Sequence, residues 1–381
     1  MNYAVVMMAI ARIFMLLFTP GPTPVPEPVR QAMATPTLHH RTPEFEAIFK
    51  EAREKLMKLF GMDECVMLAS TGTGAMQACV LNLCKTKALT VNAGKFGERF
   101  GKIVKTTGKD LVELKYEWNT PVSLEDVKKA LAEHSDIDAL FVQVSESAGG
   151  LRHPVEEIAA YVKSLNKDIM VVADGITAVG VERIDTTNID ALVAGSQKAL
   201  MLPPGLAMIG LSNEAVEKIG DGVDYYFNLS SEIKKQQQNT TAYTAATTLI
   251  IGLNAILDEI AVEGLETLYD NTISRASATQ SALEAIGFSM YPKTPALSMS
   301  TVYSEDAEPI RKLLKTKYGV NMAGGQDHLK GNLFRINQMG LIPVYESAWV
   351  VNAIELALDE LGKRPFDGTA NRTFNEIYYK A

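Results

Sequence analysis

The sequence has few of the residues that metal sites and disulfide frameworks require. Its three cysteines, Cys65, Cys79 and Cys84, lie in apolar runs and lack the paired spacing of either kind of site. Its five histidines do not form the helical pair, four residues apart and accompanied by a carboxylate, that zinc hydrolases use. We therefore expect no metal centre, and the unpaired thiols favour the reducing cytoplasm.

Positive charge is also scarce. Lysine and arginine number 37 against 45 aspartates and glutamates, which gives a net charge of -8. No stretch gathers the five or six basic residues that follow a phosphate backbone. Nucleic acid is therefore not an expected partner.

Long apolar runs are missing as well. Residues 1–18 are mostly apolar but too few to cross a bilayer, and Arg12 lies in their middle instead of at their start. No polar cleavage region follows before Thr19, which disfavours an export signal. Met15 is a suitable natural start, so we expect residues 1–14 to be an upstream extension and expect no membrane partner.

What is present is the pattern of an α/β protein. Hydrophobic residues make up 47% of the 381 residues, enough for a large core in one large or two unequal domains. Thr42 and Pro43 begin a helix that Gly61 ends. Short apolar strand candidates, several without alternation, lie at 65–69, 88–92, 111–116, 139–144, 169–173, 191–194 and 207–211. Helical patterns between them, such as 124–133 and 155–165, predict a mainly parallel seven-stranded sheet.

A second unit follows this sheet. Its expected elements are helices at 245–262, 264–286, 307–315 and 346–361 and strands at 299–303 and 333–336. We expect a large domain over 15–263, which includes the N-terminal segment, and a smaller C-terminal α+β domain over 264–381.

Thr71, Gly72 and Thr73 follow the strand that ends at Ala69, and a helical pattern begins just after them. Glycine lets the backbone approach an anion, hydroxyls donate to it, and the helix start offers free N–H groups. The segment predicts a phosphate site, although a plain capping turn explains the same residues equally well. It lacks the lysine that follows the glycines of a nucleotide P-loop.

Asp174 and Lys198 also stand at strand ends. Asp174 closes a buried apolar strand, where a carboxylate needs a partner such as a protonated ring nitrogen. Lys198 follows the strand at 191–194, beside small residues, in a setting that favours a lowered pKa. Taken singly, a turn-capping aspartate and a solvated lysine are the more ordinary interpretations.

Together these features resemble the class V aminotransferases of pyridoxal-phosphate (PLP) fold type I, in the alanine/serine–glyoxylate aminotransferase branch. The resemblance extends from about Met15 to Leu361. It rests on the Ser-Gln-Lys-Ala block around Lys198, with Pro-Pro-Gly downstream and Asp174 about two dozen residues upstream. It implies a PLP-dependent transaminase that is a homodimer with shared active sites.

The resemblance also implies a role for each matching residue. Lys198 would bind PLP as a Schiff base and move the proton, and Asp174 would pair with the pyridine nitrogen. The other cofactor contacts would come from Thr71, Gly72 and Thr73 at the phosphate, Phe96 stacked on the ring, Ser147 near the ring oxygen, Gln197 beside the phosphate, and Thr244 at the phosphate of the partner subunit's cofactor. Phe96 replaces the tryptophan or tyrosine often found there, and Thr241 stands where the family has a tyrosine.

Arg335 lies inside the apolar strand candidate at 333–336 and needs an anionic partner. An internal ion pair would satisfy it. The resemblance implies instead that it holds the substrate's α-carboxylate. The reaction would then move an amino group from a small amino acid, with alanine or serine favoured, to a 2-oxo acid such as glyoxylate or pyruvate. Arg41 or Arg152 as a second carboxylate clamp would change this preference.

Two other functions stay open. A cysteine desulfurase-like PLP lyase needs a cysteine on a mobile loop and a histidine over the ring, but Phe96 holds that position and the cysteines lie in early structural segments. A non-catalytic aminotransferase-like binding module of a transcription regulator needs a DNA-binding domain, which the short apolar stretch before Met15 does not supply.

Overall fold

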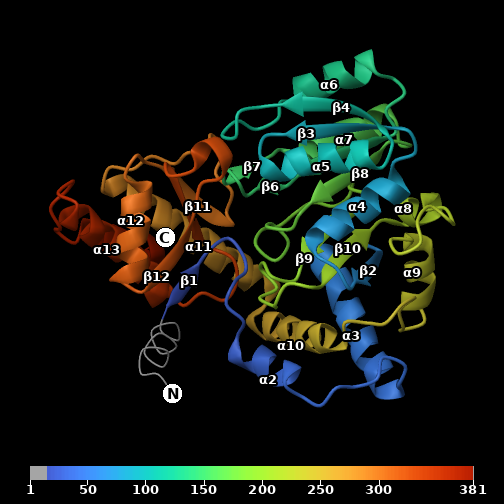
Figure 1. Ribbon diagram of the computed structural model, residues 1–381, viewed down its shortest axis with the longest axis horizontal. Helices are drawn as coiled ribbons and strands as arrows, with labels where there is room; N and C mark the ends of the chain where they lie inside the picture. The colour runs from blue at the N-terminus through green and yellow to red at the C-terminus, as the bar shows by residue number, and fades with distance from the viewer. Residues whose placement is uncertain (1–14, 381) are drawn as a thin grey trace.

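The computed structural model describes residues 15–380, which form two units lying side by side (Figure 1). The predicted upstream extension over residues 1–14 lies outside the described residues. In the part of the chain that the structure describes, no helix is both long enough and apolar enough to cross a membrane.

The large unit is built on a seven-stranded sheet with the strand order β2-β10-β9-β8-β5-β3-β4. The strands are Glu64–Leu68 (β2), Lys87–Asn92 (β3), Asp110–Lys115 (β4), Ala139–Gln143 (β5), Met170–Asp174 (β8), Ala191–Gly195 (β9) and Ala207–Leu211 (β10). Strand β10 runs antiparallel to both of its neighbours, and the other four pairings are parallel. The prediction of a mainly parallel seven-stranded sheet is confirmed.

Helices cover both faces of this sheet. One face carries α3 (Pro43–Phe60), α6 (Leu124–Glu133), α7 (Val155–Leu165) and α10 (Thr247–Glu263), and the other carries α4 (Gly72–Leu83), α5 (Lys95–Thr106), α8 (Asn213–Lys218) and α9 (Leu229–Gln236). Each face buries its own hydrophobic cluster. Because both faces are buried, the strand sequences have no need to alternate apolar and polar residues.

Helix α3 shows how closely local signals set an element's ends. The side chain of Thr42 accepts a hydrogen bond from Phe45 N, and Pro43 takes the first helical position. Gly61 ends the helix with a φ of 62°, a conformation that glycine adopts at little cost. The predicted bounds of this helix are confirmed.

The small unit is a four-stranded sheet, in the order β1-β12-β13-β11, packed against helices. Its elements are β1 (Leu16–Phe18), β11 (Met299–Tyr303), β12 (Val320–Gly324), β13 (Leu333–Asn337), α11 (Leu265–Ala285), α12 (Ala307–Thr316), α13 (Val344–Glu360) and α14 (Thr369–Lys380). Strand β1 pairs in parallel with β12, with Leu16 opposite Val320. This pairing corrects the expectation that the N-terminal segment belongs wholly to the large domain. A partner some 300 residues away leaves no mark on the local pattern.

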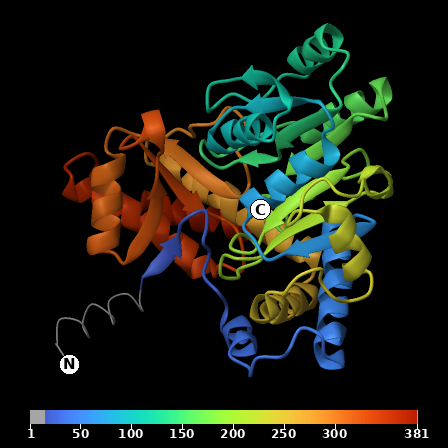
Figure 2. The same ribbon diagram turned by 45° about the vertical axis from the view of Figure 1, so that its right-hand side comes forward.

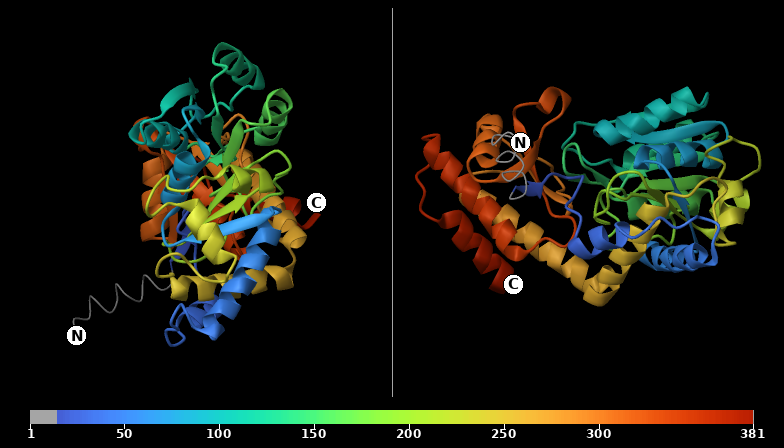
Figure 3. Two further views of the ribbon diagram at one scale, coloured as in Figure 1. Left: turned by 90° about the vertical axis from the view of Figure 1, so that its right-hand side faces the viewer. Right: turned by 60° about the horizontal axis from the view of Figure 1, so that its bottom comes forward.

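Two connections join the units. After β1 the chain passes to the large unit, where Thr23 N donates to Gln197 O at 3.1 Å and the Thr23 hydroxyl donates to Lys198 O at 2.7 Å. It continues into α2 (Glu27–Met33), which packs against α10, as the blue segment in Figure 2 shows. The second connection is Gly264, with a φ of 88°, between α10 and α11 (Figure 3). The first connection therefore runs directly beside Lys198.

Candidate active site

The carboxyl ends of the central parallel strands bring the predicted residues together. Asp174 is the last residue of β8, and Lys198 follows β9 by three residues. Strands β8 and β9 are neighbours in the sheet. Open parallel sheets bind their ligands at this edge, because the strand ends and the following loops meet there.

Asp174 is a buried carboxylate, and only one of its two oxygens has a described hydrogen bond. It is 3% exposed, and its Oδ1 accepts a hydrogen bond from Ile176 N at 2.9 Å. No described donor bonds its second oxygen. Burial raises the pKa of Asp174 to about 6, while the Ile176 N–H and the charges of Lys198 and Arg99 act to lower it. A positively charged hydrogen-bond donor would satisfy this carboxylate.

The Lys198 amine lies against the N-terminal segment. Its Nζ donates to Pro20 O at 2.5 Å. Gly21 follows with a φ of 107°, and a Cβ at this position would lie 2.5 Å from Lys198 Nζ, so only glycine lets the segment pass so close. Burial, helped by the charge of Arg335, lowers the pKa of Lys198 to about 8. The amine is thereby made a better nucleophile near neutral pH.

The predicted phosphate site at Thr71, Gly72 and Thr73, called the phosphate cup below, lies at the start of helix α4. Thr71 stands at the N-cap without a side-chain capping bond, so the plain capping interpretation of this residue does not hold. A Cβ on Gly72 would lie 2.4 Å from Ile176 Cδ1, which explains the glycine by close packing. The Thr73 hydroxyl accepts a hydrogen bond from Arg99 Nη1 at 2.9 Å. The Oε1 atom of Gln197 is buried with no described partner.

Phe96 is half-buried in the first turn of α5, with the Arg99 guanidinium 4.7 Å from its ring centroid. The backbone N–H groups of Phe96 and Gly97 both donate to Glu146 Oε2 at 2.9 Å. Glu146 ends the short strand β6 (Ser145–Glu146) and is fully buried. Burial raises its pKa to about 7. Sequence reasoning missed both Glu146 and Arg99; the one signal available for Arg99 was its place one helical turn after Phe96.

Arg335 crosses between the units. It is 6% exposed on β13, and its Nη1 and Nη2 donate to Ser147 O and Gly324 O, each at 2.7 Å. Its Nε is buried without a partner, and no described carboxylate forms an ion pair with it. The internal ion-pair interpretation is therefore not supported. Burial lowers the pKa of Arg335 to about 10, while the charge of Glu146 raises it.

The two other arginines considered as carboxylate clamps lie in different settings. Arg152 pairs with Glu156 at 2.6 Å and with Glu182 at 2.8 Å. Arg41 is exposed. The described carboxylates thus already occupy Arg152, whereas Arg41 has no described acidic partner.

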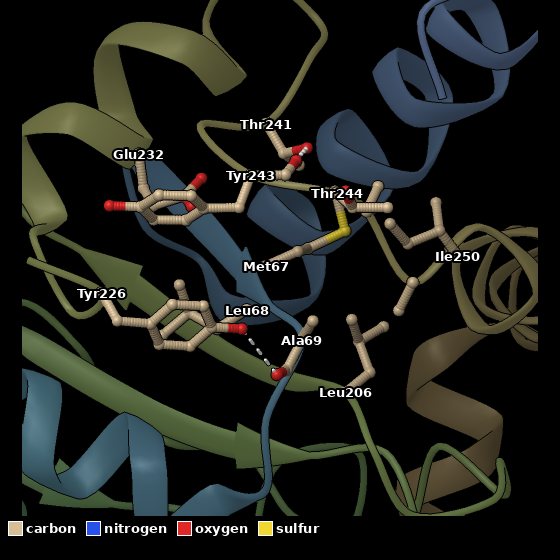
Figure 4. Close-up of a pocket in the computed structure, with 12 residues that line it drawn as sticks. Met67, Leu68, Ala69, Leu206, Tyr226, Glu232, Thr241, Tyr243, Thr244 and Ile250 are labelled. Carbon is tan, nitrogen blue, oxygen red and sulfur yellow. Dashed lines mark hydrogen bonds between the residues drawn. The ribbon is translucent and has the colours of Figure 1, made fainter. Parts of the chain in front are cut away.

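Thr244 has no described hydrogen bond to Lys198 or to the residues of the phosphate cup. It is exposed and lines a hollow with Tyr226 and Tyr243, as Figure 4 shows. Tyr226 Oη donates to Ala69 O at 3.1 Å, so this hollow adjoins the chain that leads into the phosphate cup. No described hydrogen bond joins Thr244 to the cup of its own chain. Thr241, which replaces the family's tyrosine, turns its hydroxyl to Tyr243 O.

Comparison with known proteins identifies the family. The family described as "Aminotransferase class-V" matches residues 15–339. The chain belongs to the class-V aminotransferases. It is 50% identical over 367 residues to an uncharacterized aminotransferase of Helicobacter pylori, which covers 96% of this chain and 100% of that protein.

Two further relatives have names that specify substrates. A serine–glyoxylate aminotransferase of Hyphomicrobium methylovorum is 30% identical over 364 residues, covering 91% of this chain and 90% of the relative. The crystal structure of an aspartate aminotransferase of subgroup IV from Thermus thermophilus matches with a TM-score of 0.84 and 30% identity, covering 90% of this chain and 99% of that one. The chain is thus an aminotransferase of PLP fold type I.

Class-V aminotransferases depend on PLP, and the residues at the strand ends fit this cofactor. Asp174 offers a free carboxylate oxygen in a buried setting, and Lys198 offers an amine of lowered pKa. The cysteine desulfurase-like alternative loses support. Burial raises the pKa of the Cys65 and Cys84 thiols to about 12 and raises that of Cys79 as well, so none of the three is an activated nucleophile.

Proposed function

We propose that this aminotransferase transfers the amino group of a small monocarboxylic amino acid, alanine or serine, to glyoxylate or pyruvate. The proposal rests on Arg335, because its guanidinium is buried and forms no ion pair with a described carboxylate. Such a group favours one carboxylate ligand, because a planar fork binds it through two parallel hydrogen bonds. The name of the Hyphomicrobium relative agrees with serine and glyoxylate.

In the proposed mechanism, PLP supplies the electron sink when it is bound. The free oxygen of Asp174 would accept a hydrogen bond from the protonated ring nitrogen. Lys198 would anchor the cofactor and afterwards, as a free amine, carry the proton to and from the substrate carbon. Arg335 would fix the substrate carboxylate and thereby set which bond faces Lys198.

Other cofactor contacts belong to the same proposal. Thr71, Gly72, Thr73 and Gln197 would surround the phosphate, Phe96 would stack on the ring, and Ser147 would lie near the ring oxygen. The exposed Thr71 and the unpartnered Gln197 Oε1 support the first part. Arg335 bonds the carbonyl of Ser147 and leaves the Ser147 hydroxyl available, which supports the last part.

The substrate proposal is tested by incubating PLP-loaded protein with single amino acids and measuring the 2-oxo acid released, with glyoxylate or pyruvate as acceptor. We expect alanine and serine to turn over at least about ten times faster than aspartate or glutamate, because a second carboxylate lacks a second clamp. A preference for aspartate would refute the small-donor assignment. A lack of turnover with all four donors would refute the proposed function.

We further propose a homodimer in which Thr244 reaches the phosphate bound by the partner subunit. Its exposure and the lack of a described hydrogen bond to its own cup support this assignment. Two variants that are each inactive, Lys198→Ala and Thr244→Asp, test it when mixed and allowed to exchange subunits. A shared site predicts recovered activity, since one site per heterodimer then has Lys198 and the partner's Thr244 intact. No recovery from exchanged subunits would contradict sharing.

We also propose a cytoplasmic location. The three cysteines are free and buried, and a reducing compartment keeps such thiols unpaired.

A further inference from the structure

Arg99 lies at the phosphate cup although no strand-end motif predicted it. Its Nη1 donates to the Thr73 hydroxyl at 2.9 Å, and its guanidinium lies 4.7 Å from the Phe96 ring centroid. Thr73 belongs to α4 and Phe96 to α5, so the arginine joins the two helices that begin beside the candidate cofactor site. Its position is thus fixed by contacts on both sides.

The charge of Arg99 has no counter-ion in the described chain. One of its five N–H donors is used by Thr73, and no described carboxylate pairs with it. Its charge nevertheless reaches the centre of the site, since it acts to lower the pKa of both Asp174 and Lys198. A half-buried cation without an acidic partner, facing a cup of hydroxyl and N–H groups, is a setting for an anion.

The residues predicted to surround the phosphate are all neutral. Thr71, Gly72, Thr73 and Gln197 offer hydrogen bonds, and the start of α4 adds about half a positive charge. A phosphate monoester carries roughly 1.5 to 2 negative charges at neutral pH. The neutral cup therefore leaves charge uncompensated, and the guanidinium beside Thr73 is the cation placed to balance it.

We propose that Arg99 is the cationic ligand of the cofactor's phosphate group. The assignment rests on the proposed placement of PLP between Lys198 and the cup. The guanidinium lies over the Phe96 ring, and Thr73 is the one described acceptor of its N–H groups. Its other N–H groups are therefore available to phosphate oxygens, which arginine can bind through two parallel hydrogen bonds.

The test compares PLP with pyridoxal, which lacks the phosphate, on cofactor-free protein. We expect Arg99→Gln to weaken PLP binding by about 10- to 100-fold and to change pyridoxal binding far less, because pyridoxal has no phosphate to lose a charge-assisted hydrogen bond. Only the effect of Arg99 on the pKa of Lys198 and Asp174 would then act on pyridoxal. Inorganic phosphate should raise the melting temperature of the wild-type apoprotein and not that of this variant. Arg99→Lys should fall between the two.

A matched control is Lys102→Gln on the same helix, because Lys102 is exposed and pairs with Glu98 at the surface. This variant should keep wild-type affinity for PLP and the wild-type response to phosphate. Equal loss of PLP and pyridoxal in Arg99→Gln, or unchanged PLP affinity, would overturn the assignment.

The Lys198→Ala variant separates this inference from the proposed function. Stabilisation by inorganic phosphate should persist in it, because the cup and Arg99 remain. If wild-type protein fails to transaminate but still separates PLP from pyridoxal through Arg99, the proposed reaction is wrong and the phosphate ligand is right. If an Arg99→Gln variant binds PLP with normal affinity and transaminates, the proposed reaction is right and the phosphate ligand is wrong.

Discussion

At the scale of single residues, Lys198 is the side chain whose surroundings most alter its chemistry. Burial and the charge of Arg335 disfavour its protonated form, and Asp174 opposes them only in part. The result is an amine whose pKa falls to about 8. An ordinary surface lysine near neutral pH is protonated almost completely and cannot attack a carbonyl group.

The rate at which apoprotein binds PLP covalently should therefore rise with pH and level off above a midpoint near 8. Arg335→Gln removes a neighbouring positive charge, which makes protonation of Lys198 easier, so the midpoint should move to higher pH. The exposed Arg372→Gln serves as control and should keep the wild-type midpoint. Stopped-flow absorbance at several pH values measures this. A midpoint that Arg335→Gln leaves in place would falsify the electrostatic explanation.

At the scale of elements, the start of α4 depends on the packing of Gly72 under Ile176. A Cβ on Gly72 would lie 2.4 Å from Ile176 Cδ1 and 3.1 Å from Cγ1. Ile176 N in turn donates to Asp174. The glycine thus lets the phosphate cup and the Asp174 turn pack directly against each other.

Gly72→Ala should destabilise the protein by about 1–3 kcal/mol, as overpacking of a filled core does. Adding Ile176→Val removes the Cδ1 atom with the 2.4 Å contact and should restore much of this loss. Urea unfolding of the two single variants and the double variant measures the coupling between the positions. Strictly additive losses would show that the contact is not the cause.

At the scale of the whole molecule, a cluster of contacts joins the units beside Phe96. Lys95 Nζ lies 2.7 Å from Asp327 Oδ2, and the rings of Trp118 and His328 pack edge to face with centroids 4.7 Å apart. Asp327 begins the short helix η1 (Asp327–Leu329), a few residues after Gly324, whose carbonyl Arg335 holds. The small unit therefore contacts the large one next to Phe96 and to the segment that Arg335 binds.

Asp327→Asn should raise the KM for the amino donor by about two- to fivefold with little change in unfolding midpoint, because an exposed pair contributes little to stability but here positions the Gly324 segment. Asparagine suits the test because Asp327 has a φ of 47°, which asparagine tolerates well. The same change in a Lys95→Gln background should have no further effect on KM. An equal rise in both backgrounds would mean that the ion pair does not act.

The sequence by itself determined the elements whose signals are local. Helix α3 has its cap, its proline and its terminal glycine within the chain that forms it, and the buried strands of the large sheet are marked by apolar runs. The family motif around Lys198 and Asp174 is equally local. These features allowed the fold class and the main chemistry to be predicted.

Only the tertiary structure decided contacts between segments distant in sequence. Strand β1 pairs with β12, the N–H groups of Phe96 and Gly97 donate to Glu146, and Arg99 donates to Thr73. All of these contacts depend on how separate elements pack. Arg335 is the clearest example. Its place in an apolar strand predicted an anionic partner, but no described carboxylate pairs with it in the fold. Local patterns record burial and capping, whereas the neighbours of a charged side chain are set by the packing of the whole chain.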